Sequence, residues 1–191
     1  MSQWKFQRDA IQAFRFVRCG FDPQTGVAQL VYAFDDGPEL VETVTVPGAP
    51  FALDGERAAA VERALRLLHL LTGVSYYKAA VPREIRIDGY AIDADTAALL
   101  QTVYENGLGE FAYRNGLHLR GRIAFPHGDA GTAPAPALGL REHALVAIGG
   151  GKDSLVSIEA LRRAGVEQTV TWIGGSQLIR ACAERTGLPT L

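Results

Sequence analysis

The 191-residue sequence contains only two cysteines and carries a net charge of only −2. Cys19 and Cys182 lie far apart and have no metal-ligand spacing, which suits a reducing compartment better than a disulfide framework. The small net charge encodes no global attraction to nucleic acid or to an anionic membrane, so neither is expected as a partner. Any affinity for phosphate must therefore be local.

Long apolar runs and histidine clusters are also missing. The longest apolar segment, 64–74, is too short and interrupted to span a bilayer, and the amino terminus lacks the apolar stretch of a secretory signal. We therefore expect a cytoplasmic protein. The histidines form no pair or triad, and we expect structural roles for two of them and surface or loop positions for the others: His69 and His143, and His118 and His127, respectively.

The first part of the chain predicts an α+β domain. Apolar and polar residues alternate between 14 and 46, and the breaks DPQTG and DDGP are typical turns of an antiparallel meander. Asp54 and Gly73 are predicted to begin and end a first helix, and a second is expected from about Asp93 to Asn106, with a stop at Gly107. A short strand is predicted over 84–88.

A second domain is predicted after a linker. Residues 128–140 are rich in Ala, Pro and Gly and lack apolar periodicity, so they are expected to join domains at 1–127 and 141–191. Strands and helices alternate in the second domain, which predicts a parallel sheet with right-handed crossovers. Two strands and two helices cannot cover both faces of such a sheet, so we expect a fragment of a longer protein.

The segment GGGKDS, from Gly149 to Ser154, joins the first strand of that domain to its first helix. Free backbone N–H groups at a helix start favour a phosphate, and glycines let the main chain approach it. Lys152 would add positive charge, Ser154 a hydroxyl donor, and Asp153 a carboxylate suited to magnesium through water. The alternative is a glycine-rich turn that only lets strand and helix pack closely.

Two common phosphate loops do not fit this segment. The Walker A pattern requires other residues at Val146 and Asp153, and the dinucleotide fingerprint requires glycine at Ser154. The segment instead resembles the ATP pyrophosphatase loop, Ser-Gly-Gly-x-Asp-Ser, and departs from it only at Gly149, which lacks the hydroxyl donor of serine. The resemblance implies the start of an adenine nucleotide alpha hydrolase-like α/β domain that binds ATP and Mg²⁺.

Carried over residue by residue, the resemblance implies that Gly150, Gly151, Asp153 and Ser154 contact ATP, with Gly149 and Lys152 in the same loop. Enzymes with this loop cleave ATP between the α and β phosphates and attach AMP to a substrate oxygen.

One family is similar over the whole chain. The triple-glycine loop, the segment LLTGVSYYKAAVP (70–82) and a β-rich amino-terminal domain resemble the UDP-N-acetylmuramoyl-L-alanyl-L-glutamate epimerase family. This resemblance implies an ATP- and Mg²⁺-dependent inversion of the terminal L-glutamate through an acyl-adenylate, in peptidoglycan precursor synthesis. The substrate is then a nucleotide-sugar dipeptide, and this chain alone is expected to be inactive.

The same resemblance favours substrate binding by the SYYK segment: Ser75, Tyr76, Tyr77 and Lys78. The alternative is that the two tyrosines pack beneath a turn and the lysine is solvated. Two other functions stay open: a different adenylating enzyme, for tRNA modification or amidation, and an ATP-binding module without turnover. A tRNA enzyme is expected to have a basic surface and extra cysteines, and this sequence has neither.

Overall fold

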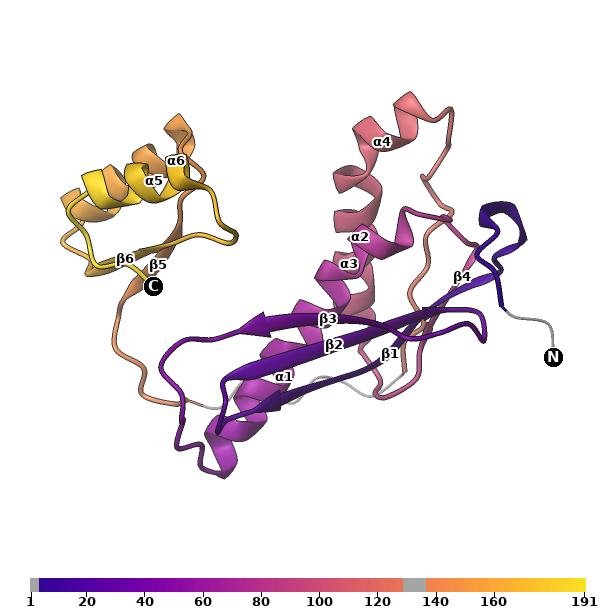
Figure 1. Ribbon diagram of the computed structural model, residues 1–191, viewed down its shortest axis with the longest axis horizontal. Helices are drawn as coiled ribbons and strands as arrows, with labels where there is room; N and C mark the ends of the chain where they lie inside the picture. The colour runs from indigo at the N-terminus through magenta and orange to yellow at the C-terminus, as the bar shows by residue number, and fades with distance from the viewer. Residues whose placement is uncertain (1–3, 129–136) are drawn as a thin grey trace. The chain divides into compact units, whose positions relative to one another are not determined.

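The computed structural model describes residues 4–128 and 137–191, which fall into two compact units (Figure 1). The first unit precedes Ala137 and the second runs from there to Leu191. The expected linker at 128–140 lies mostly outside the described residues, so the predicted domain limits stay a prediction. Within the described part of the chain, no helix is long and apolar enough to cross a membrane.

The first unit contains a four-stranded sheet in the order β3-β2-β1-β4. The alternating region forms β1 (Ala13–Asp22), β2 (Val27–Phe34) and β3 (Leu40–Thr45), and these pair antiparallel, which confirms the predicted meander. The predicted short strand is β4 (Glu84–Ile87), and it pairs parallel with β1. The sheet is therefore mixed rather than a pure antiparallel meander.

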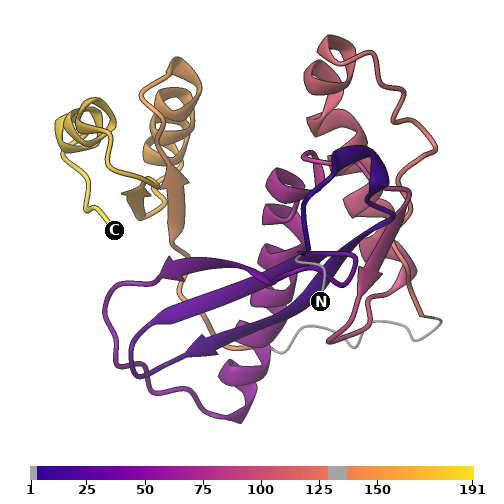
Figure 2. The same cartoon turned by 45° about the vertical axis from the view of Figure 1, so that its right-hand side comes forward.

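Helices pack against one face of this sheet, and Figure 2 shows α1 running behind the strands. The two predicted helices form, and the Asp54 and Asp93 carboxylates cap them by accepting from the N–H groups of the third helical residue. A short helix follows each of them. The helices are α1 (Gly55–Thr72), α2 (Val74–Tyr77), α3 (Ala94–Gly107) and α4 (Gly109–Arg114), preceded by a 3-10 turn, η1 (Arg8–Ala10).

The two glycines predicted as helix stops lie where α1 and α3 end, but a short helix follows each of them. Gly73 has a right-handed helical conformation, with φ −56°, and the chain continues directly into α2. Gly107 is the last residue of α3, and α4 begins two residues later. Gly73 caps the end of α1, and glycine is also needed there for space, because a Cβ would lie 2.4 Å from the ring of Phe16.

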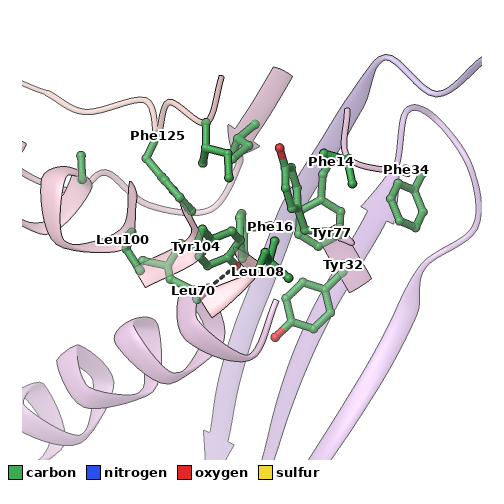
Figure 3. Close-up of a cluster of buried hydrophobic side chains, with 14 of the residues drawn as sticks. Phe14, Phe16, Tyr32, Phe34, Leu70, Tyr77, Leu100, Tyr104, Leu108 and Phe125 are labelled. Atoms are coloured by element: carbon green, nitrogen blue, oxygen red, sulfur yellow. Dashed lines mark hydrogen bonds between the residues drawn. The ribbon is translucent and has the colours of Figure 1, made fainter. Parts of the chain in front are cut away.

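Buried aromatic side chains fill the space between the sheet and the helices (Figure 3). Two tyrosine hydroxyls donate to carbonyls in the last turn of α1: Tyr32 to His69 O at 2.9 Å and Tyr104 to Leu70 O at 2.6 Å. Helix carbonyls at such an end have no partner within the helix. The tyrosines therefore fix the end of α1, immediately before Gly73.

His69 is fully buried in this core, as predicted. Its Nε2 lies 3.0 Å from Val31 O, which can only accept, so Nε2 carries the proton and Nδ1 accepts from Tyr90 Oη at 3.0 Å. Burial lowers the pKa of His69 below its usual value. A neutral, fully bonded imidazole supports the fold and is not available to a substrate.

Strand β1 changes the direction of its side chains at Val17. Its register against β2 shifts between Phe16 and Arg18, so one extra residue is accommodated there. Phe14 and Phe16 therefore face the helices before the bulge, and Cys19 and its odd-numbered neighbour Phe21 pack against the same core after it.

The second unit alternates strand and helix, as predicted. Strands β5 and β6 pair in parallel, and Val170 of β6 forms a further parallel bridge to Thr190. The small core of this unit lies between the strands and the two helices. The elements are β5 (Ala144–Ala147), α5 (Lys152–Arg163), β6 (Gln168–Thr171) and α6 (Gln177–Arg185).

Candidate nucleotide-binding site

The GGGKDS segment leaves the carboxyl end of β5 and opens α5. Gly150 has φ +82°, in the left-handed region that favours glycine, and Gly151 is the extended N-cap residue, with φ −92° and ψ 170°. No side chain caps the first turn of α5. The first backbone N–H groups of this 12-residue helix therefore stay free for a ligand.

Packing does not explain all three glycines. A Cβ on Gly149 or on Gly151 would meet no heavy atom within 4 Å. At Gly150 the nearest atom would be Cys182 Sγ, at 3.6 Å, which is an ordinary contact, so the positive φ is what requires glycine there. Close packing of strand against helix thus accounts for neither Gly149 nor Gly151, whereas an approaching anion would need their bare main chain.

The side chains of the loop differ in availability. Lys152 and Asp153 are exposed, and within 4–128 and 137–191 neither side chain has a hydrogen-bond or ion-pair partner. Ser154 Oγ instead donates to Gly151 O at 2.9 Å. The serine therefore stabilises the turn in this conformation, and it would have to release Gly151 O before it could donate to a phosphate.

A magnesium ion would find one carboxylate here. Among the described residues, no group of three or more His, Cys, Asp or Glu side chains is arranged to hold a metal. Mg²⁺ commonly binds through one or two carboxylates, substrate phosphates and water. Asp153 beside a bound phosphate fits that pattern, so the metal would depend on the nucleotide.

Sequence reasoning missed a second loop at the same edge of the sheet. The carboxyl ends of parallel neighbours such as β5 and β6 lie side by side, and ligands of open α/β sheets bind at that edge. The loop after β6 contains Ile173, which is 97% exposed, and Gly174, with φ +99°. Ser176 then caps α6 by accepting from Ile179 N at 3.4 Å. A Gly-Gly-Ser turn between a predicted strand and helix was the available signal.

The SYYK segment divides between the core and the surface. Tyr77 is fully buried among the core aromatics and donates to Pro82 O at 3.2 Å (Figure 3), so it packs beneath the turn. Burial raises its pKa to about 12. Tyr76 is half-buried and donates to Glu42 Oε2 at 2.8 Å. Ser75 and Lys78 are exposed. Substrate binding thus stays a prediction, and Ser75, Tyr76 and Lys78 are the members that a ligand can reach.

The other histidines provide no catalytic pair. His143 precedes β5 and contacts Thr169 Oγ1 at 2.8 Å and Glu167 at 3.5 Å, at the amino end of the strands and away from the glycine loop. His118 and His127 are exposed in irregular segments, as predicted. No acid or base for proton transfer is identified among them.

An apolar cavity of about 290 Å³ lies in the first unit, between α1, the sheet and the segment after β3. All of its lining side chains are apolar, so it has no group that would recognise a charged ligand. They are Phe21, Ala28, Val44, Val46, Phe51, Leu53, Val61, Ala64, Leu65 and Leu68.

Residues 5–191 match the family model of the MurL N-terminal domain. The sequence is 74% identical over 186 residues to a UDP-N-acetyl-alpha-D-muramoyl-L-alanyl-L-glutamate epimerase of Xanthomonas oryzae, covering 97% of this chain and 41% of that protein. Proteins of the same name from Salinispora tropica and a Micromonospora species are 38% and 39% identical, each over 95% of this chain. The chain spans about two fifths of the length of these curated relatives. No solved structure matches it.

Proposed function

Because the chain belongs to the MurL N-terminal domain family, we propose that it is part of an enzyme that converts the terminal L-glutamate of UDP-N-acetylmuramoyl-L-alanyl-L-glutamate to D-glutamate, using ATP and Mg²⁺. The relatives named for this reaction support the substrate, since one is 74% identical over nearly the whole chain. An enzyme of peptidoglycan precursor synthesis that consumes ATP would work in the cytoplasm.

The nucleotide part of the proposal rests on the glycine loop. Gly149 and Gly151 have no neighbour that requires glycine, and the first N–H groups of α5 have no side-chain cap. These features favour a pyrophosphate at the helix start, with Lys152 as counter-charge and Asp153 directed to Mg²⁺. The second unit would then be the first part of an ATP pyrophosphatase-type domain.

ATP would serve to make the glutamate Cα–H acidic. A free carboxylate leaves that proton too weakly acidic for a protein base, whereas an acyl-adenylate withdraws electrons from the adjacent carbon. Attack of the carboxylate oxygen on the α-phosphorus would form the adenylate and release pyrophosphate. Proton removal, return of a proton to the opposite face and hydrolysis would give the D-product and AMP. In this series of reaction steps, the loop would hold the triphosphate for the first step.

The exposed members of the SYYK segment are the proposed contacts to the nucleotide-sugar dipeptide. Lys78 has no ion-pair partner in the described part of the chain and offers a positive charge to a carboxylate or phosphate. The alternative of a tRNA-modifying enzyme lacks support, because the sequence carries a net charge of −2.

Gly151→Ala in the full-length enzyme tests the loop. The added Cβ meets nothing within 4 Å and φ is negative, so stability should not change, but the methyl group would occupy the space of the anion. Gly109→Ala is the matched control, because its Cβ also meets nothing within 4 Å and it lies in the first unit. Asp153→Ala tests the metal-directed carboxylate.

The assay incubates each enzyme with the UDP-linked L-Ala-L-Glu dipeptide, ATP and Mg²⁺ in deuterium oxide. We expect AMP release and deuterium at the glutamate Cα to fall together by about 100-fold or more in Gly151→Ala, as for loss of a preorganised anion site, and to persist in Gly109→Ala. Wild-type enzyme that produces neither AMP nor deuterated product would refute the proposed reaction. Unchanged turnover in both loop variants would refute the loop's role only.

A further inference from the structure

The parallel sheet of the second unit has one covered face and one open face. Alternate residues of β5 and β6, including Val146 and Val170, are buried against α5 and α6. Leu145 and Ala147 point the opposite way, and Leu145 is 58% exposed. Figure 1 shows both helices on the same side of the two strands.

The strand order explains why one face stays open. The chain moves from β5 to β6 and then to Thr190 on the far side of β6, so both steps run in the same direction across the sheet. Right-handed crossovers made in one direction place their helices on one face. A helix on the Leu145 face would therefore come with a crossover that moves in the other direction, to the free side of β5.

The free edge of β5 has backbone groups that can pair with such a strand. Among the described residues β5 pairs with β6 alone. Ala144 N and Ile148 N donate toward this partner, to Glu167 O at 2.8 Å and Thr171 O at 2.9 Å. Because N–H groups alternate along a strand, the amides of Leu145 and Ala147 face the unpaired edge.

We propose that a strand from the remainder of the longer protein pairs in parallel with this free edge of β5, and that its crossover helix packs on Leu145 and Ala147. The chain spans about two fifths of the length of its relatives, so most of their length is available to supply both elements. Parallel sheets occur almost only with both faces covered, which favours a helix rather than solvent as the occupant.

This pairing would also complete the edge that carries the glycine loop. With a strand on each side of β5, the crossovers leave in opposite directions at its carboxyl end, and such a switch point is where open α/β sheets form a ligand crevice. The Gly149–Ser154 loop would then have a second wall. This strand pairing depends on the sheet alone and would be the same for any ligand of that loop.

Hydrogen exchange of the unmodified full-length protein tests the pairing. We expect the amides of Leu145 and Ala147 to exchange at least about 100-fold more slowly than in the unfolded chain, because a packed sheet opens only by rare sub-global unfolding. Rapid exchange at both positions would overturn the inference.

Thiol labelling tests the covered face, with peptide mapping used to quantify label at the introduced cysteine. Leu145→Cys in the folded full-length protein should react at least about 100-fold more slowly than in urea, because reaction needs the same rare opening. Arg163→Cys, on the exposed last turn of α5, is the control and should react rapidly. Equal labelling rates at 145 and 163 would show that no helix covers Leu145 and would refute that part of the proposal. Protection at 145 that disappears on dilution would assign the face to a second copy and would also overturn the proposal.

Discussion

Replacement of Gly73 by alanine should destabilise the first unit, although alanine is the better helix residue. Gly73 lies between α1 and α2 with φ −56°, so its backbone conformation suits any residue. The added Cβ would lie 2.4 Å from Phe16 Cε1 and 3.1 Å from Tyr32 Cε1. Carbon atoms pack at about 3.5–4.0 Å, so the overlap with Phe16 exceeds what a small adjustment removes.

The magnitude follows from how tightly Phe16 is held. Its ring is fully buried, with His69 at 5.3 Å and Phe125 at 6.0 Å between ring centroids, so it has no free space to move into. Overpacking of this kind costs about 1–3 kcal/mol, and replacing glycine in a helical conformation returns about 0.5–1 kcal/mol. We expect a net loss of about 1–2 kcal/mol.

Gly107→Ala is the matched control, because Gly107 ends α3 and its Cβ would meet nothing within 4 Å. This variant should gain about 0.5–1 kcal/mol. Equilibrium urea unfolding can be followed for each unit separately, since Trp4 and Trp172 lie in different units, and Trp172→Phe leaves Trp4 to report on the first. A Gly73→Ala midpoint at or above that of the wild type would show that the core can absorb the methyl group and would refute the packing argument.

Three further outcomes test the core. Tyr104→Phe removes the 2.6 Å hydrogen bond to Leu70 O and leaves a buried carbonyl unpaired, so urea unfolding should show a loss of about 1–3 kcal/mol; Tyr113→Phe, at a residue 89% exposed, should show none. Because burial lowers the pKa of His69, this imidazole takes up its proton in the unfolded chain at a higher pH than in the folded protein, and stability should fall as pH drops below about 6.5, by at most about 1.4 kcal/mol per pH unit from this group. An NMR signal assigned to the His69 imidazole of the folded protein that titrates at or above pH 6.5 would contradict this. Tyr77 should ionise near pH 12 in ultraviolet titration of the folded protein, and a transition near pH 10 for this residue would mean that its hydroxyl is not buried.

Local patterns predicted most elements of the fold. Period-2 alternation identified the three antiparallel strands, and Asp54 and Asp93 correctly marked two helix starts because their carboxylates bind the first N–H groups. The strand and helix alternation of the second unit was equally local. The parallel pairing of β4 with β1 was not predictable in the same way, since it joins residues about 70 positions apart and no repeat in the sequence links them.

The glycines show where local rules were insufficient. Gly73 and Gly107 were predicted as stops, and α1 and α3 do end there, but the pattern did not show that a short helix follows each of them or that the Phe16 ring requires glycine at 73. Within the candidate site, the sequence identified GGGKDS by its order of residue types. It did not indicate that Ser154 Oγ donates to Gly151 O, and it left open whether Tyr77 packs beneath a turn or binds substrate, because both depend on three-dimensional contacts.

The bulge at Val17 makes the alternation of β1 change phase within a single strand. Even-numbered residues such as Phe16 serve the aromatic core before it, and odd-numbered residues such as Phe21 line the apolar cavity after it. Removing Val17 would restore an uninterrupted ladder but would turn Cys19 and Phe21 outward. One surplus residue thus lets a single strand contribute both to the aromatic core and to the lining of the apolar cavity. Homologous chains would have to keep its position, whatever side chain they place there.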